Sequence, residues 1–235
     1  MATYFISDIH GEYTLFRRLL DYIKFSSLDS MIVLGDFLDK GNNSIALANF
    51  IATNKNIKAI SGNHEYFFMG HYQYIMREFD YNGNVDRVLD KLGEYFCGEQ
   101  EKITWELVDY LESLPYYIEA DEYICVHAGV ALDDNCRVIK MDKQDYKHFI
   151  FDRNFANYRL APKDSKTILF GHTPCHYANT TGQIIKTPRK DKSIKSNNIL
   201  DFAKIQLDTG ASHTGLLGCL RLDDMAEFYV KQQLK

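Results

Sequence analysis

The chain has 235 residues, of which 46% are hydrophobic and 25% charged, a composition typical of globular proteins. Its formal net charge of −5 provides no long-range attraction to nucleic acid or to an anionic membrane, so we expect neither as a partner. Any anionic substrate would have to be held by local positive charge. The length is compatible with one large α/β domain, and we predict a single domain over residues 1–235.

Cysteine usage and the length of apolar runs bear on the compartment. The five cysteines form no CxxC pair and their number is odd, so neither a zinc knuckle nor a disulfide framework is indicated. No apolar run is long enough for a membrane span, and none near the N-terminus is long enough for a signal peptide. We therefore predict a cytoplasmic, soluble protein.

The first 60 residues alternate short apolar runs with amphipathic stretches. Strands are predicted at residues 3–6, 31–34 and 57–60, and helices at residues 13–25 and 44–53. This βαβαβ pattern predicts a largely parallel sheet with right-handed crossovers. Chemistry collects at the carboxyl ends of such strands, which here carry SDIH, GDFLD and GNHE.

The remaining chain is first helical and then rich in strands. Helices are predicted at residues 64–79, 85–96 and 103–114, so that residues of about 80–114 form a small helical insertion. Later strands are predicted at residues 116–118, 123–126, 167–170 and 204–207, with a hairpin over 216–230. The basic segment 186–198 is predicted to be a solvated hairpin loop, with a substrate-facing loop as the alternative.

Residue types that bind metals follow several of these strands. Asp8 and His10 are two residues apart after the first strand, so in extended backbone both side chains would point to one face. Further candidates each follow an apolar run and would reach the same edge: Asp36, Asn63, His64, His127 and His172. Carboxylate, amide and imidazole donors without thiolate suit a borderline divalent metal such as manganese, iron or zinc.

Five motifs in order, SDIHG, GDFLDKG, GNHE, VHAG and FGHTP, closely resemble the signature motifs of one branch of the calcineurin-like metallophosphoesterases. That branch is the phosphoprotein phosphatases, of the bacterial and phage serine/threonine type. The resemblance extends to LESLPYY and LDTGA, and so spans residues 4 to about 220. It implies an α/β fold, the metallophosphoesterase αββα sandwich with mixed sheets, and hydrolysis of phosphate monoesters.

The resemblance also implies a dinuclear metal centre. Two sets of residues match the family's ligands: Asp8, His10 and Asp36 for one ion, and Asn63, His127 and His172 for the other. Asp36 would bridge the ions, because two cations roughly 3.5 to 4 Å apart need a shared carboxylate. A hydroxide bound between them would attack phosphorus in line. Asn63 would also contact the substrate phosphate. Two divalent ions are expected, with manganese first and iron or zinc as alternatives.

Four further residues match family positions that handle the substrate. His64 would donate a proton to the leaving oxygen, and Asp39 would orient its ring and keep it protonated. Lys40 stands where the family has an arginine that grips the phosphoryl oxygens, and lysine supplies the charge without the bidentate fork. Arg153 matches a second phosphate-binding arginine, although Phe151 replaces the tryptophan two residues before it.

Two residues of LDTGASHTG have less definite roles. His213 lies where a loop could reach the site, and either contact with substrate or no functional role is open. Asp208 is expected to brace a neighbouring side chain, because histidines that bind metals usually donate their other N–H to an acceptor.

The leading functional prediction is a serine/threonine protein phosphatase-like enzyme that acts on a phosphorylated protein or a small phosphomonoester. The alternative is a phosphodiesterase or dinucleoside polyphosphate hydrolase on the same fold. Relatives of that kind often lack the aspartate of GDxxD and read GNHD, whereas this chain has Asp39 and GNHE. A non-catalytic binding module is a remote alternative, because all six ligand positions and His64 are present.

Overall fold

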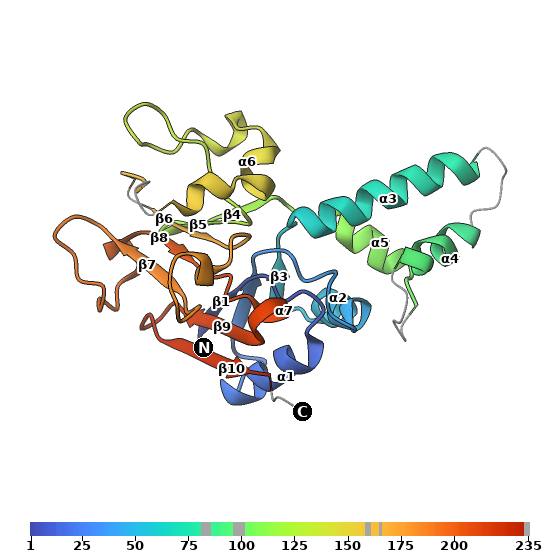
Figure 1. Cartoon of the computed structure of the whole chain (residues 1–235), viewed down its shortest axis with the longest axis horizontal. Coiled ribbons are helices and arrows are strands. Elements are labelled where there is room, and N and C mark those ends of the chain that lie inside the picture. Colours follow the sequence, from blue (N-terminus) through green and yellow to red (C-terminus); the bar gives the residue numbers. More distant parts are fainter. Residues whose placement is uncertain (81–85, 96–101, 158–160, 165, 233–235) are drawn as a thin grey trace.

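The computed structural model describes residues 1–80, 86–95, 102–157, 161–164 and 166–232. Two mixed sheets of five strands each are stacked between helices, which confirms the αββα sandwich that the resemblance implied (Figure 1). Within the described ranges, no helix is both long and apolar enough to span a bilayer.

The first sheet has the strand order β10-β9-β1-β2-β3. Its strands are β1 (Thr3–Ile6), β2 (Ser30–Val33), β3 (Ile57–Ala59), β9 (Leu216–Arg221) and β10 (Glu227–Lys231). The predicted parallel core is confirmed, because β2 pairs in parallel with both β1 and β3, and the crossovers are helices α1 (Tyr13–Tyr22) and α2 (Ser44–Thr53). The predicted hairpin forms the antiparallel edge of this sheet.

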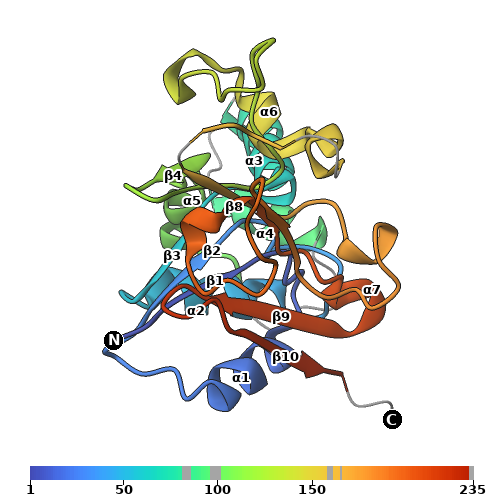
Figure 2. The ribbon, with the colours of Figure 1, turned by 90° about the vertical axis from the view of Figure 1, so that its left-hand side faces the viewer.

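The second sheet has the order β4-β5-β6-β8-β7. Its strands are β4 (Tyr117–Glu119), β5 (Tyr123–Val126), β6 (Thr167–Phe170), β7 (Ile185–Pro188) and β8 (Phe202–Gln206). Short helices in the connections are η1 (Met141–Lys143), α6 (Tyr146–Phe151), η2 (Arg153–Ala156), η3 (Cys175–Tyr177), η4 (Ile199–Asp201) and α7 (Ala211–Thr214). Figure 2 shows α1 and α6 at opposite ends of the stack.

Alternation along the strands explains the layers. In β1, Phe5 faces the second sheet and packs in a core with Leu169 and Phe202, whereas its neighbours Tyr4 and Ile6 face the helices of the first sheet. A third core lies between the second sheet and α6. Each sheet therefore buries both faces, which requires the apolar runs that the sequence shows.

Three helices extend from the body of the molecule beside the sheet edge (Figure 1). They are α3 (Asn63–Asp80), α4 (Asp86–Tyr95) and α5 (Trp105–Glu112), and Thr104 caps α5 by accepting a hydrogen bond from Leu107 N. Helices α4 and α5 fall where the helical insertion was predicted. Residues 81–85 and 96–101 of that insertion lie outside the described residues.

The basic segment contains a strand that the sequence pattern did not reveal. Residues 185–188 form β7, and the charged groups nearby are used within the fold: Lys186 pairs with Glu227 at 2.6 Å and Lys192 with Asp201 at 2.8 Å. Arg189 donates to the carbonyl oxygens of Leu200 and Lys166. Residues 186–188 thus belong to a strand and not to the predicted solvated hairpin loop, and the contacts of Lys186, Arg189 and Lys192 disfavour the substrate-facing alternative.

Candidate metal centre

The site lies at the carboxyl ends of the central strands, where the chain turns sharply. Asp8 and His10 have φ of 53° and 48°, so the expected extended backbone is wrong: β1 ends at Ile6, and a left-handed turn brings the two side chains together. Asp36 and His172 are left-handed as well, with φ of 51° and 64°. Such strain in non-glycine residues costs roughly 1 kcal/mol or more each and gathers at functional sites.

Two glycines allow these turns to pack against the carboxylates. A Cβ on Gly62 would overlap the Oδ1 of Asp36, and a Cβ on Gly171 would overlap the Oδ2 of Asp8. Only glycine therefore fits in front of Asn63 and His172. The glycines of GNHE and FGHTP are explained by this close approach.

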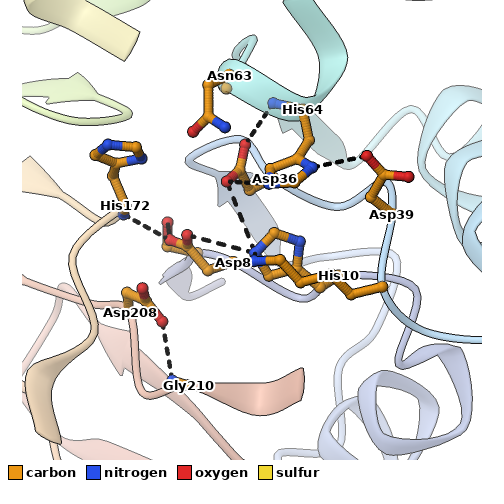
Figure 3. Close-up of polar contacts among 12 residues, drawn as sticks. Asp8, His10, Asp36, Asp39, Asn63, His64, His172, Asp208 and Gly210 are labelled. Atoms are coloured by element: carbon orange, nitrogen blue, oxygen red, sulfur yellow. Dashed lines mark hydrogen bonds and ion pairs between the residues drawn. The ribbon is translucent and has the colours of Figure 1, made fainter. Parts of the chain in front are cut away.

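Asp36 is the centre of the arrangement (Figure 3). Its Oδ2 lies 3.3 Å from His127 Nε2, 3.7 Å from His10 Nε2 and 3.8 Å from His64 Nε2. Its Oδ1 accepts a hydrogen bond from the backbone N–H of His64 at 3.0 Å. One buried carboxylate oxygen thus faces three imidazoles at once.

Backbone carbonyls fix the orientation of two of these rings. His10 Nδ1 lies 3.0 Å from Leu38 O, and His127 Nδ1 lies 2.8 Å from Leu34 O. In each ring an Nδ1–H that donates to the carbonyl leaves Nε2 as the nitrogen that could bind a cation. Metal-binding histidines are usually held in this way.

The remaining predicted ligands surround His127 and Asp8. His127 Nε2 lies 3.1 Å from Asn63 Oδ1 and 3.2 Å from His172 Nδ1. Asp8 Oδ2 accepts from the backbone N–H of His172 at 2.9 Å, and its Oδ1 lies 4.0 Å from His10 Nε2. The structure therefore brings all six predicted ligand residues to one place.

The donor set fits two divalent cations. Two groups of side chains have ligand atoms within 4.8 Å of one another, and Asp36 belongs to both: His10, Asp36 and His64, and Asp36, His127 and His172. The first group contains His64 where the resemblance implied Asp8, whose Oδ1 lies 4.0 Å from His10 Nε2. Nitrogen and oxygen donors without thiolate suit a borderline metal. Lys40 Nζ lies 2.8 Å from His10 Nε2, so a cation that binds this nitrogen would replace the lysine as its partner.

Burial and mutual charge perturb the pKa values throughout the cluster. Burial lowers the pKa of His10 to about 4 and, together with the charge of His127, that of His172 to about 3. Burial opposes the charged form of His127, but Asp36 raises its pKa to about 10. Burial raises the pKa of Asp8 to about 6. A cation that binds here must displace protons, so its binding is coupled to pH.

His64 and Asp39 form a hydrogen-bonded pair. His64 Nδ1 lies 2.8 Å from Asp39 Oδ2, and His64 Nε2 faces the cavity side of Asp36. Burial opposes the charged form of His64, but the hydrogen bond to Asp39 and the charge of Asp36 raise its pKa above the ordinary value. The ring is thus oriented and favoured in the protonated form that a general acid requires.

A small polar cavity of about 70 Å³ opens in front of these groups. Lys40 lines it, and so does Arg153 of η2, whose Nη1 donates to His172 O at 3.1 Å. His213 lies at the same cavity, which favours the substrate-facing possibility left open for it. Asp208 also lines the cavity, but its Oδ1 accepts from Gly210 N at 2.9 Å and so braces its own loop.

Glu65 is a central residue that the sequence reasoning missed. Its carboxylate is fully buried and accepts four backbone N–H bonds, from Asp36, Phe37, Leu38 and Gly62, at 2.8 to 3.0 Å. Burial and the charge of Asp36 raise the pKa of Glu65 to about 7, whereas the N–H donors favour the ionised form. Glu65 therefore fastens the loop of Asp36 to the start of α3. The only indication in the sequence was that Glu65 is the acidic residue that ends the motif GNHE.

Comparison with known proteins identifies similar chains. The sequence is 27% identical to the symmetrical bis(5'-nucleosyl)-tetraphosphatase of Haemophilus ducreyi, over 67% of this chain and 56% of that protein. The protein of the same name from Aggregatibacter actinomycetemcomitans is also 27% identical, over 68% of this chain and 54% of its own. The chain thus spans about half the length of these curated relatives.

Solved structures share the fold at low sequence identity. A metallophosphoesterase from Sphaerobacter thermophilus matches with a TM-score of 0.58 and 16% identity, over 100% of this chain and 90% of that one. A cold-active protein-tyrosine phosphatase of Shewanella matches with a TM-score of 0.54 and 16% identity, over 98% and 80%. The family model of calcineurin-like phosphoesterases matches residues 1–204. The chain belongs to the calcineurin-like phosphoesterase family.

Proposed function

We propose that this chain is a metal-dependent hydrolase that cleaves a phosphoanhydride bond in dinucleoside polyphosphates. The observation that carries the hydrolase chemistry is the Oδ2 of Asp36, which faces the Nε2 atoms of His10, His64 and His127 at 3.3 to 3.8 Å. The substrate class is supported by the curated relatives, which are symmetrical tetraphosphatases. It corresponds to the alternative weighed from the sequence and takes precedence over a protein phosphatase.

In this proposal the side chains divide the work between ions and substrate. Two divalent cations, manganese first and iron or zinc as alternatives, would supply an activated water and neutralise phosphoryl charge when bound. Asp36 would be the ligand shared by both ions. Lys40 and Arg153, at the cavity, would hold the phosphoryl oxygens and stabilise charge that develops on them. Glu65, Gly62 and Gly171 hold the loops that carry the candidate ligands in position.

The pair of His64 and Asp39 supports a second candidate, the hydrolysis of phosphomonoesters. A phosphoanhydride releases a nucleoside phosphate, which leaves as a stable anion and gains little from a proton donor. An alkyl monoester releases an alkoxide, which needs one. The 2.8 Å contact between His64 and Asp39 provides such a donor. Phosphomonoesters therefore remain the second candidate class.

Product analysis on a substrate panel separates the two candidates. Manganese-loaded protein is incubated with diadenosine tetraphosphate, a phosphoserine peptide and p-nitrophenyl phosphate, and kcat/KM is measured for each. We expect the largest kcat/KM, by about tenfold or more, for diadenosine tetraphosphate, with ADP as the sole product. A preference of that size for the phosphopeptide would replace the first candidate by the second. If no substrate is cleaved faster than by the Asp36→Asn variant, both candidates are wrong.

A further inference from the structure

A cleft of about 420 Å³ lies between α3 and α5, and its lining includes Phe67, whose ring contacts that of His64. Its walls combine the aromatic rings of Tyr66 and Phe67 and the aliphatic Leu111 with polar groups of Gln73 and Glu112. This volume falls within the range of small-molecule sites. An apolar wall with a few polar groups is also typical of such sites. None of these five side chains takes part in the metal centre.

Phe67 connects the cleft to the site. It lies one helical turn after His64 on α3, and the two ring centroids are 6.4 Å apart in an edge-to-face arrangement. The ring packs at 5.7 Å against Phe151, which belongs to α6, yet 48% of Phe67 is exposed. An aromatic face that is held in place by neighbours and open to solvent is a ready stacking surface for a planar ring.

Gly70 leaves the cleft open at its helical wall. It lies in the middle of α3 with ordinary helical backbone, where glycine is less favourable than alanine. Apart from its chain neighbours and the backbone of its own helix, no heavy atom of the described residues lies within 4 Å of the position that a Cβ would take. Neither packing nor backbone geometry thus requires glycine here. Its effect is to keep free space beside Phe67.

We propose that this cleft binds the nucleoside of the leaving half of the substrate, with the base stacked on Phe67. Gln73 and Glu112 provide hydrogen-bond partners for the base edge or the ribose hydroxyls. The inference rests on the proposed function, because a dinucleoside polyphosphate carries a nucleoside at the end of a flexible phosphate chain. His64 faces the leaving group in that function, and Phe67 is the aromatic side chain next to it on α3.

The contribution of the nucleoside can be measured without catalysis. Manganese-loaded protein is titrated calorimetrically with ADP and, separately, with inorganic pyrophosphate, which has the same phosphate groups and no nucleoside. We expect ADP to bind about tenfold or more tightly, in the range that stacking of one base on an aromatic ring provides. Equal affinity for the two ligands in the wild-type protein would overturn the inference.

A substitution that fills the cleft locates the effect. In Gly70→Leu we expect the preference for ADP to fall to within about twofold of unity, because the leucine side chain occupies the space for the base. The matched control is Gly93→Leu in α4, where the described residues likewise leave open space around a Cβ and where the cleft does not reach. Both substitutions place a strong helix former in a helix. An undiminished preference for ADP in Gly70→Leu would contradict the inference.

Replacement of the stacking ring gives an independent reading. Phe67→Ala should lose most of the preference for ADP, and Phe67→Tyr should retain it because the aromatic face is kept. The outcome does not depend on the proposed reaction. If ADP is preferred and Gly70→Leu abolishes the preference, but diadenosine tetraphosphate is not cleaved, the nucleoside site stands and the proposed reaction is wrong. If the tetraphosphate is cleaved but the wild-type protein shows no preference for ADP, the proposed reaction stands and the nucleoside site is wrong.

Discussion

At the scale of single residues, the contact between Asp39 and His64 gives the first prediction. If His64 donates a proton to the leaving oxygen, His64→Ala should slow hydrolysis of an alkyl phosphate by about 10²- to 10⁴-fold, because its alkoxide leaves poorly without a proton. The loss on diadenosine tetraphosphate should be much smaller. Asp39→Asn should act in the same direction, since it removes the carboxylate charge that helps to raise the pKa of His64. The kcat values of both variants on both substrates decide this, and equal losses would indicate a binding role instead.

Lys40 gives the second prediction at this scale. Its ammonium lies 2.8 Å from His10 Nε2 and lines the same cavity as Arg153, so it is placed to meet a phosphoryl oxygen. Lys40→Ala should lower kcat/KM and weaken inhibition by inorganic phosphate together, by about tenfold or more, because transition state and product present similar oxygens. Lys40→Arg should keep most activity, since the charge is retained. Wild-type turnover and phosphate inhibition in Lys40→Ala would place Lys40 outside the substrate site.

At the scale of secondary-structure elements, a buried lysine ties the second sheet to the segment that carries Arg153. Lys204 of β8 is buried, and its Nζ donates to Phe155 O at 2.5 Å and to Asn157 O at 2.7 Å. The ammonium also lies 4.9 Å from the ring centroid of Phe155. A neutral amine still has two N–H groups for the two carbonyls, so these bonds do not require the charge. Lys204 thus fixes the carboxyl end of η2.

The charge of Lys204 makes stability depend on pH. Burial lowers its pKa from 10.5 to about 8, so between these values the unfolded chain binds a proton that the folded chain does not. The contribution of Lys204 to the free energy of unfolding therefore rises with pH in that window and is constant below it. We expect the difference in unfolding free energy between wild type and Lys204→Met to increase by up to about 3 kcal/mol from pH 8 to 10.5. Urea unfolding of both proteins across this range measures it, and a difference independent of pH would contradict the shifted pKa.

Elements with a clear apolar period were predictable from the sequence. The strand at Thr3–Ile6 and the helix at Ser44–Thr53 have the predicted bounds, because their buried faces determine their pattern. The strand β7 was missed, since Lys186 and Pro188 interrupt its short run and all four of its residues are only half-buried. A strand at the edge of a sheet needs less apolar surface than a central one, and edges tolerate proline and lysine. Local pattern does not reveal such a strand.

The candidate site likewise has features that the sequence predicted and features that it did not. The metal-ligand types were predictable because motifs in order place them at strand ends, but the left-handed turns of Asp8 and His10 were not, since no periodicity reports backbone handedness. The role of Glu65 depends on four backbone N–H groups, three of which belong to residues 36–38. Only the packed loops bring those donors together. Sequence reasoning thus found the candidate ligands that the fold brings together and missed a residue that holds their loops in place.

At the scale of the whole molecule, the two-sheet sandwich positions the candidate metal ligands, and the helices beside it form a separate cleft. Loops from both sheets supply the cluster around Asp36. The cleft between α3 and α5 lies outside this cluster, and its shape depends on how the helices of the insertion pack. Family and fold were therefore predictable from the motifs. The motifs do not predict a substrate in the same way, because they contain the candidate metal ligands and not the residues that line the cleft.

Metal content tests the shared role of Asp36 most directly. Protein reconstituted with excess manganese and then desalted should retain two ions per chain by atomic absorption, because the donors form two groups that share Asp36. Asp36→Asn should lose both ions together with hydrolysis of diadenosine tetraphosphate, whereas Asp109→Asn, an exposed change on α5, should match wild type. Two ions retained in Asp36→Asn, or fewer than two in the wild-type protein, would contradict a dinuclear centre bridged by Asp36.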